Sequence, residues 1–453
     1  MHDRDFTEAV WSLDPIDLDN IDQYVQGKVS FDHNRGLELK IPIGCLFGLR
    51  KGDGFYYSSI EPHTATCAYG FSQSGDYLTM TNISADDPGF SCPGFQCQTI
   101  LGQALIVSKA PAEPNPLITS ISARIPGLRE WIAKSPCETR LMIDEATSKV
   151  NSVGFNYDAA KAEDVTLFES DGVKISANYS GTYPGGPLPR YEFRFIDDYK
   201  LRISFDKPIS LDEAFSKWLI RTWNFISLCI GFRSSVDSIE FINATTNKKC
   251  EYYVPLVEDD GNADPDALRK IPFSYKRIDD KVQGMLATWL NLDDYIAEAA
   301  GLTVNLLSKQ VMPLDMLFLA SSHALEGFSS TYASQKEKRS GHFKPAAIHE
   351  KQLLDDLEPL TSKLIPNREA FLQLQTENRN GYTHLNRSKQ TLVHDELYWH
   401  MKAVQLLDYA AAMHAIGVEP AEILHALDES RYRANDQYFI RQMYSIPETE
   451  STE

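Results

Sequence analysis

A short segment in the C-terminal part of the chain carries two side chains suited to cutting RNA without a metal. It runs from Arg379 to His384 and reads Arg-Asn-Gly-Tyr-Thr-His. An arginine stays charged at any working pH and holds a phosphate through a planar fork of N–H donors. A histidine titrates near neutrality and can take or give a proton. The pair therefore indicates phosphate chemistry with acid–base assistance.

The spacing decides whether these two residues can act together. On a continuous helix, with about 100° per residue, five positions place Arg379 and His384 roughly 140° apart. The dipeptide Asn380-Gly381 is a strong turn signal. We therefore expect a helix to end near the arginine and the histidine to lie beyond a break, where the side chains can converge. The motif alone is also compatible with a solvated surface turn.

Helices are expected on both sides of the motif. Apolar residues at three- and four-residue steps from Leu397 to Met413, followed by Gly417, predict a long helix with a glycine cap. Residues 367–375 predict a second helix. A third is expected over Leu314–Phe328, and it carries the sequence Ala-Leu-Glu-Gly. A helical bundle is therefore expected around the motif.

The Arg-Asn-x-x-x-His pattern in this setting resembles the active-site motif of the HEPN ribonucleases. The order of an Ala-Leu-Glu helix, a basic loop, two helices, the motif and a long helix ending in Ala-Ile-Gly-Val is similar to the HEPN domain of ApeA-type anti-phage proteins. This resemblance covers about residues 291–445. Trp11, the Gly27–Phe31 segment, and the Trp218–Gly231 helix followed by residues 236–241 resemble the ApeA N-terminal domain.

The resemblance implies roles for the residues of the motif. His384 would be the acid/base, Arg379 would hold the scissile phosphate, and Asn380 would position the arginine or contact the substrate. Tyr382 and Thr383 would support the site, although Tyr382 could instead simply pack into the core. No metal or other cofactor is expected, and the products would be a 2′,3′-cyclic phosphate and a 5′-hydroxyl.

Glu326 and the apolar face of the long helix are also expected to contribute to the site. A carboxylate on a mostly apolar helix usually has a partner, so Glu326 is expected to orient Arg379 or else to lie exposed at the helix end. One histidine cannot readily serve as both acid and base. HEPN domains usually pair, so a homodimer or a higher homo-oligomer is expected, with the Leu397–Met413 face as the contact or as an internal core.

The charge of the chain limits its general affinity for nucleic acid. The net charge is −19 with a pI of about 5.0, which argues against a protein that coats nucleic acid through phosphate neutralisation. A local basic patch would suffice for a nuclease. Lys336, Lys338 and Arg339 lie in one loop and are expected either to guide the RNA substrate or to be solvated.

The remaining composition indicates a globular intracellular protein. Of the 453 residues, 43% are hydrophobic and 11% aromatic, which suits a packed core. We expect a cytoplasmic location, because neither an apolar signal core nor a membrane-spanning run is present. The seven cysteines are scattered and expected to be reduced, and a zinc site around Cys92 and Cys97 is disfavoured against ordinary loop cysteines.

The predicted fold class is α+β, with a β-rich N-terminal domain over 1–290, a helical domain over 291–445 and a disordered acidic tail over 446–453. Alternating apolar residues predict hairpins over 29–41 and 191–205. Ser210 and Glu213 predict a capping box that opens a core helix.

The function expected from these features is a metal-independent endoribonuclease in abortive anti-phage defence. The N-terminal domain would sense a phage-derived trigger or restrain the nuclease, and no membrane partner is expected. The alternative is a non-catalytic binding or sensor protein whose helical domain is a dimerisation scaffold. The acidic charge favours this alternative, and the intact arginine and histidine disfavour it.

Overall fold

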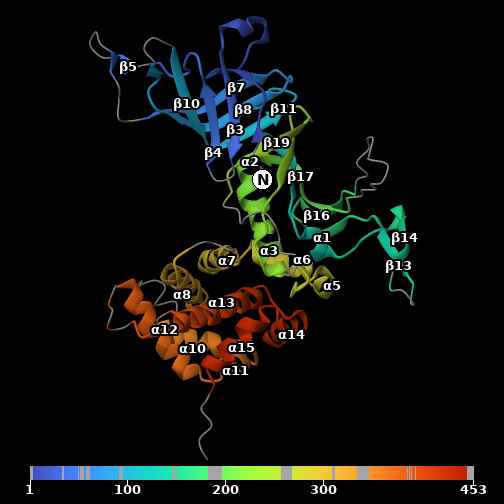
Figure 1. Ribbon diagram of the computed structural model, residues 1–453, viewed down its shortest axis with the longest axis vertical. Helices are drawn as coiled ribbons and strands as arrows, with labels where there is room; N and C mark the ends of the chain where they lie inside the picture. The colour runs from blue at the N-terminus through green and yellow to red at the C-terminus, as the bar shows by residue number, and fades with distance from the viewer. Residues whose placement is uncertain are drawn as a thin grey trace, which may run out of the picture. The chain divides into compact units, whose positions relative to one another are not determined.

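The computed structural model describes most of the chain: residues 4–32, 35–48, 50–51, 56–57, 62–90, 95–144, 148, 150–181, 196–256, 268–308, 312–333, 346–384, 386, 388, 390–392 and 394–445. It forms two compact units (Figure 1). The first comprises residues 1–128, 135–220 and 235–261, and the second 129–134, 221–234 and 262–453. A β-rich region is followed by helices, which confirms the α+β class. The boundary at residue 290 stays a prediction, and the 446–453 tail lies outside the described residues.

The first unit is built from antiparallel strands. Its long sheet follows the order β15-β16-β17-β12-β18-β19-β11-β8-β7-β2-β3-β4-β10-β9, with β1 added beside β3. The strands are β1 (Arg4–Asp5), β2 (Ala9–Ser12), β3 (Val25–Asp32), β4 (Gly36–Ile41), β7 (His63–Ser72), β8 (Tyr77–Ala85), β9 (Gly89–Phe90), β10 (Gln96–Gly102), β11 (Ala104–Ser108), β12 (Leu117–Arg124), β15 (Val165–Ser170), β16 (Val173–Tyr179), β17 (Tyr199–Ser210), β18 (Ser238–Asn243) and β19 (Lys249–Tyr253).

Two separate strand pairs and several short helical turns complete this part of the chain. The pairs are β5 (Arg50–Lys51) with β6 (Tyr56–Tyr57), and β13 (Cys137–Ile143) with β14 (Val150–Tyr157). The turns are η1 (Leu18–Gln23), η2 (Ala159–Lys161), α2 (Leu211–Glu213) and the π-helical η3 (Ala214–Leu219).

One part of the long sheet closes on itself. Strand β8 pairs with β7 along one edge and with β10 along the other, where Ile100 lies opposite Ala85. Strands β2, β3, β4, β10, β8 and β7 therefore form a closed six-stranded barrel. The predicted hairpin over 29–41 is confirmed as β3 and β4. Gly36 adopts a φ of 88° at its turn, a conformation that glycine reaches without steric cost.

Trp11 and Gly70 are packed against each other in this barrel. The indole is 1% exposed, and its Nε1–H donates to the Gly27 carbonyl oxygen over 3.3 Å. A Cβ atom added to Gly70 would lie 3.0 Å from two carbons of the indole ring. Glycine is therefore needed here to make room for the tryptophan.

Replacing Gly70 by valine is expected to lower the free energy of unfolding by about 1–3 kcal/mol, because the indole must move within a packed core. Urea unfolding followed by tryptophan fluorescence measures the change. Gly48→Val is the matched control, since no atom lies within 4 Å of a Cβ built there. Equal stability of the two variants would contradict the packing argument.

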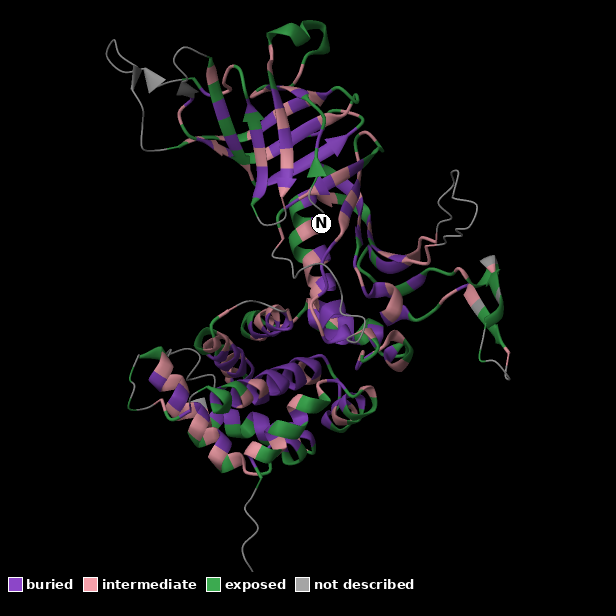
Figure 2. Ribbon diagram, in the orientation of Figure 1, coloured by how far each residue is buried: buried purple, intermediate pink, exposed green. Residues whose placement is uncertain are grey.

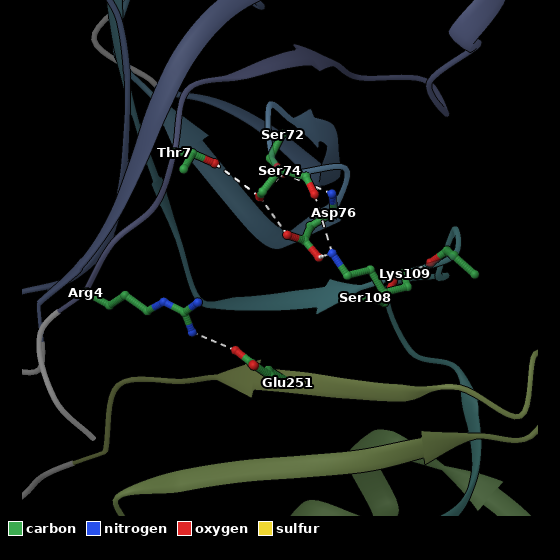
Figure 3. A network of polar contacts seen from close by, with 9 residues as sticks. Arg4, Thr7, Ser72, Ser74, Asp76, Ser108, Lys109 and Glu251 are labelled. Atoms are coloured by element: carbon green, nitrogen blue, oxygen red, sulfur yellow. Dashed lines mark hydrogen bonds and ion pairs between the residues drawn. The ribbon is translucent and has the colours of Figure 1, made fainter. Parts of the chain in front are cut away.

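The turn between β7 and β8 is held by a compact polar network, shown in Figure 3. Ser74 Oγ donates to Asp76 Oδ2 over 2.7 Å, and the backbone N–H of Asp76 donates to Ser72 Oγ over 3.0 Å. Lys109 Nζ lies 2.6 Å from Asp76 Oδ1. This carboxylate therefore links the turn to the end of β11, and the contacts with Lys109 and Ser74 lower its pKa against the opposing effect of burial.

Several local predictions in this region are confirmed. Ser210 caps the following helix, with its side chain accepting from the Glu213 backbone N–H over 3.3 Å. Strands β18 and β19, which follow this helix, pair with each other. Strand β17, predicted as half of a hairpin over 191–205, pairs with β16 and β12 instead, and residues 191–195 lie outside the described residues.

The second unit is helical. Its helices are α1 (Leu128–Ile132), α3 (Ile220–Ile230), α5 (Tyr275–Ile278), α6 (Val282–Leu290), α7 (Asp294–Leu306), α8 (Leu314–Ser329), η4 (Ser330–Tyr332), α10 (Ala346–Asp356), α11 (Leu360–Leu364), α12 (Arg368–Thr383), α13 (Asp395–Ala415), α14 (Pro420–Ser430) and α15 (Ala434–Met443). The first residue of α1 and that of α3 are counted with the first unit. The helices predicted over Leu314–Phe328 and from Leu397 onward are confirmed as α8 and α13.

Helix α13 forms the centre of this unit, and Figure 2 shows it buried along nearly all of its length. Leu397 and Met401 pack with Phe318 of α8 and Leu392 in one cluster. The apolar side chains between Leu397 and Met413 thus serve the internal core. A homodimer, which stays a prediction, would need another surface.

The apolar segment at residues 221–230 is also buried in the helical unit. Trp223 Nε1 donates to the Ser234 carbonyl oxygen over 3.0 Å, and Tyr432 Oη donates to the Gly231 carbonyl oxygen over 2.6 Å. This confirms that the helix opened by Ser210 is a core helix. Among the described residues, no helix is both long and apolar enough to cross a membrane.

Candidate functional site

A pocket of about 390 Å³ opens between α7, α8, α10 and α12 of the helical unit. Its walls are mostly apolar and include Ala299 and Leu302 of α7. The polar groups at the wall include Glu298 from α7, Glu326 from α8, His349 from α10 and Arg379 from α12. A few polar groups around an apolar cavity of this size are typical of a ligand site.

Arg379 and Glu326 form an ion pair at this pocket. Arg379 Nη2 lies 2.6 Å from Glu326 Oε2, with the arginine side chain 36% exposed and the glutamate side chain 21% exposed. Arg379 Nη1 lies 3.5 Å from Asn380 Oδ1, at the long limit for a hydrogen bond. The hypothesised contact between Glu326 and Arg379 is therefore present. Whether it orients the arginine for catalysis stays a prediction.

The helix that carries the motif does not break where the sequence predicted. Helix α12 continues through Asn380 and Gly381 to Thr383, so the predicted break is wrong. Gly381 is buried, and its carbonyl oxygen accepts from the Asn386 backbone N–H over 2.8 Å and from Gln390 Nε2 over 3.2 Å. The glycine thus allows the returning chain to pack against the helix.

His384 caps the C-terminal end of α12. Its backbone N–H bonds to the Asn380 carbonyl oxygen over 3.1 Å, and its side chain is exposed. Because the helix is continuous to Thr383, Arg379 and His384 lie about 140° apart around its axis. His384 does not line the pocket that contains Arg379. The expected convergence of the two side chains within one chain is therefore not found.

The two supporting residues of the motif have different environments. Tyr382 packs edge-on against Phe318 with ring centroids 5.8 Å apart, and its hydroxyl donates to the Leu392 carbonyl oxygen over 3.0 Å. Burial raises its pKa. Thr383 is exposed. Tyr382 thus packs into the core. The sequence had left open whether this residue supports the site or packs into the core.

Sequence reasoning missed two buried carboxyl groups, one of which interacts with the Arg379–Glu326 pair. Glu350 of α10 is 3% exposed, and burial, followed by the charge of Glu326, raises its pKa to about 7. Asp408 of α13 is fully buried, and burial and Glu350 hold its pKa well above the usual range. The Arg379–Glu326 pair therefore lies near a carboxyl group, that of Glu350, which gains its proton near neutral pH. No sequence pattern predicted that α10 would pack beside the Arg379–Glu326 pair.

Other sequence predictions concern residues that lie away from this pocket or outside the described part of the chain. The basic residues Lys336, Lys338 and Arg339 lie outside the described residues. His400 is completely buried, and burial lowers its pKa to about 3, so it is neutral. Within the described ranges, no group of three or more His, Cys, Asp or Glu side chains is arranged to hold a metal ion. Cys92 falls outside those ranges.

The comparisons with known proteins define the class of the chain through its N-terminal part. A family model described as ApeA N-terminal domain 1 matches residues 9–289, more than half of the 453 residues. The chain therefore belongs to the ApeA N-terminal domain 1 family. This supports an ApeA-type defence protein and a part in anti-phage defence. The matched residues end before Glu326 and Arg379. No curated protein and no solved structure matches the chain.

Proposed function

We propose that the protein is a metal-independent endoribonuclease of the HEPN type that acts in abortive anti-phage defence. Arg379 would stabilise the charge of the scissile phosphate, and His384 would move protons at the 2′-hydroxyl and the leaving 5′-oxygen. The products would carry 2′,3′-cyclic phosphate and 5′-hydroxyl ends. The observation that carries the proposal is the guanidinium of Arg379 held by Glu326 at the mouth of a ligand-sized pocket.

The geometry of α12 supports a reaction shared by two copies of the chain. Arg379 and His384 diverge around a continuous helix, so a second copy would complete the site, and the two histidines would divide the acid and base steps. Such a composite site requires a twofold homodimer. Mixing an Arg379→Ala chain with a His384→Ala chain should then restore part of the cleavage, because the mixed dimer keeps one arginine and one histidine. A mixture as inactive as either variant would exclude a shared site.

Sequencing of RNA ends after expression tests the activity, the chemistry and the target together. The expected result is a set of new 5′-hydroxyl ends paired with 2′,3′-cyclic phosphates, made by the wild type and not by His384→Ala. The same ends should form with purified protein in the presence of EDTA. Cleavage that stops on chelation would contradict the metal-independent mechanism.

A non-catalytic sensor is the second candidate, favoured by the same ion pair. An arginine bound to a glutamate on a neighbouring helix can have a purely structural role, in which the ion pair joins α8 to α12. In that case, the helical unit would be a scaffold for the β-rich part. The sensor hypothesis expects equal toxicity from wild type and His384→Ala, and no RNA ends that depend on His384.

Removing Glu326 should separate positioning from folding. Glu326→Ala is expected to lower RNA cleavage about tenfold or more, because Arg379 loses its fixed orientation. The free energy of unfolding should change by less than about 1 kcal/mol, since the pair is partly solvated. Glu326→Gln keeps an acceptor oxygen and should recover most of the rate. Glu377→Ala, a carboxylate on α12 that Gln373 binds, is the control; equal losses in both alanine variants would refute positioning.

A further inference from the structure

The pocket beside Arg379 has an aromatic wall and an apolar floor as well as a cation. Tyr295 of α7 lines it and is 56% exposed, so a face of its ring is available. Ala299 forms part of the floor and is 4% exposed. A Cβ atom added to Gly327 of α8 would lie 2.6 Å from the Ala299 methyl carbon. Helices α7 and α8 are therefore in close contact under the pocket, and its floor is fixed.

We propose that this pocket binds one nucleotide, with the base against Tyr295 and the apolar floor and the phosphate against Arg379. The identity of the phosphate as part of an RNA strand rests on the proposed function. A stacked base on an exposed aromatic ring is the common way in which proteins hold unpaired nucleotides. The volume of about 390 Å³ lies in the range of small-molecule sites.

The guanidinium of Arg379 retains donors for this phosphate. Arginine carries five N–H groups in a planar fork, and its contacts in the described part of the chain are with Glu326 through Nη2 and Asn380 through Nη1. An anion can approach the remaining donors. His323 of α8 and His349 of α10 also line the pocket.

The nearby carboxyl groups limit how tightly a phosphate can bind. Glu326 is paired with the arginine and cancels its charge. Glu350 is neutral for the most part below about pH 7, because burial raises its pKa, so it adds little repulsion near neutrality. A phosphate alone should therefore bind weakly, and most of the affinity should come from the base. The contribution of the base therefore distinguishes the proposed nucleotide site from a site that binds a simple anion.

Calorimetric titration of the full chain with 3′-AMP, adenosine and inorganic phosphate tests the proposal. A 3′-monophosphate has no scissile bond, so binding is measured without turnover. Wild type is expected to bind 3′-AMP more tightly than either fragment. Tyr295→Ala, which removes the stacking ring, and Leu302→Trp, which fills the cavity, should each weaken binding about tenfold or more.

The control is Tyr438→Ala, a change of the same type at a residue of α15 that is 59% exposed and does not line the pocket. It should bind 3′-AMP as wild type does. No binding by wild type, or equal binding by Tyr295→Ala and Leu302→Trp, would overturn the proposal. Circular dichroism spectra that match the wild type show that the variants are folded.

The outcomes distinguish this pocket from the nuclease as a whole. Nucleotide binding without any RNA cleavage would contradict the proposed function and leave the pocket standing. RNA cleavage without nucleotide binding would contradict the proposed nucleotide pocket and leave the proposed function standing. If Tyr295→Ala lowers both binding and cleavage, the nucleotide belongs to the RNA substrate. If it lowers binding alone, the occupant is a free nucleotide, and the assignment to the RNA strand is overturned.

Discussion

Replacing His384 by alanine is expected to slow RNA cleavage by about 10²–10⁴-fold, the usual contribution of a general acid or base. The imidazole is exposed at the C-terminal end of α12, so its removal should leave the fold intact. Single-turnover cleavage of a labelled RNA by purified protein measures the rate, and cell survival on induction gives a second readout. A full rate from His384→Ala would exclude the proposed chemistry.

His425→Ala is a matched control for this experiment. His425 lies on α14 with a side chain that is 71% exposed, 3.7 Å from the Glu429 carboxylate. Its replacement removes a solvated imidazole of the helical unit without touching α12. Cleavage and toxicity should therefore be unchanged. If both histidine variants lose the same activity, the loss reflects a general effect on the protein rather than catalysis at His384.

Local patterns predicted several elements of the fold. The apolar spacing predicted both α8 and α13; α8 turns an apolar stripe toward the core, whereas α13 is buried on all sides from Ala403 to Met413. Ser210 predicted the start of its helix, because the cap is a local hydrogen bond in which the Ser210 side chain accepts from the Glu213 backbone N–H. The β3–β4 hairpin followed from alternation and from Gly36. In each case the interaction that decides the structure lies within a few residues along the chain.

The turn predicted at Asn380-Gly381 failed because distant contacts override local preference. Asn378 Oδ1 accepts from the Leu392 backbone N–H over 2.9 Å, and Asn378 Nδ2 donates to Thr391 Oγ1 over 2.8 Å. The chain therefore returns over the end of α12 and is bound there. These bonds favour a continuous helix with a buried glycine at Gly381. Turn propensity is a weak preference that tertiary packing can exceed.

The composition of the candidate site was only partly predictable. Glu326 was expected beside Arg379, because a carboxylate on an apolar helix needs a partner. Glu350 and the pocket wall from α7 depend on how four helices pack, and no local pattern encodes that packing. The order of strands β17, β12 and β18 is a similar case, since each pairing joins residues far apart in sequence.

The largest effect on stability is expected from His400, which is buried among aromatic rings. Its Nε2–H donates to Gln375 Oε1 over 2.9 Å, and its Nδ1 accepts from the Tyr444 hydroxyl. Both nitrogens are thus satisfied in the neutral form. Burial lowers the pKa of His400 from 6.5 to about 3. Protonation would place an uncompensated charge in the core and reverse the bond to Tyr444.

The sign of the pH dependence follows from this shift. Between about pH 6.5 and 3, the unfolded chain binds a proton at His400 and the folded chain does not, so stability falls as the pH falls. This loss of stability begins below about pH 6.5 and reaches on the order of 4 kcal/mol once the pH falls to about 3. Glu350 acts oppositely, because its raised pKa favours the folded state below about pH 7.

The two groups therefore offset each other in the wild type, and variants are needed to separate them. Relative to wild type, His400→Gln should gain about 1.4 kcal/mol for each pH unit below about 6.5, as measured by urea unfolding with far-ultraviolet circular dichroism. Glu350→Gln should instead gain as the pH rises from about 4.5 to 7. His425→Gln, at an exposed position, should follow the wild-type curve throughout. A constant difference between His400→Gln and wild type across this range would show that His400 is protonated in the folded protein, against the neutral, doubly bonded imidazole that the core requires.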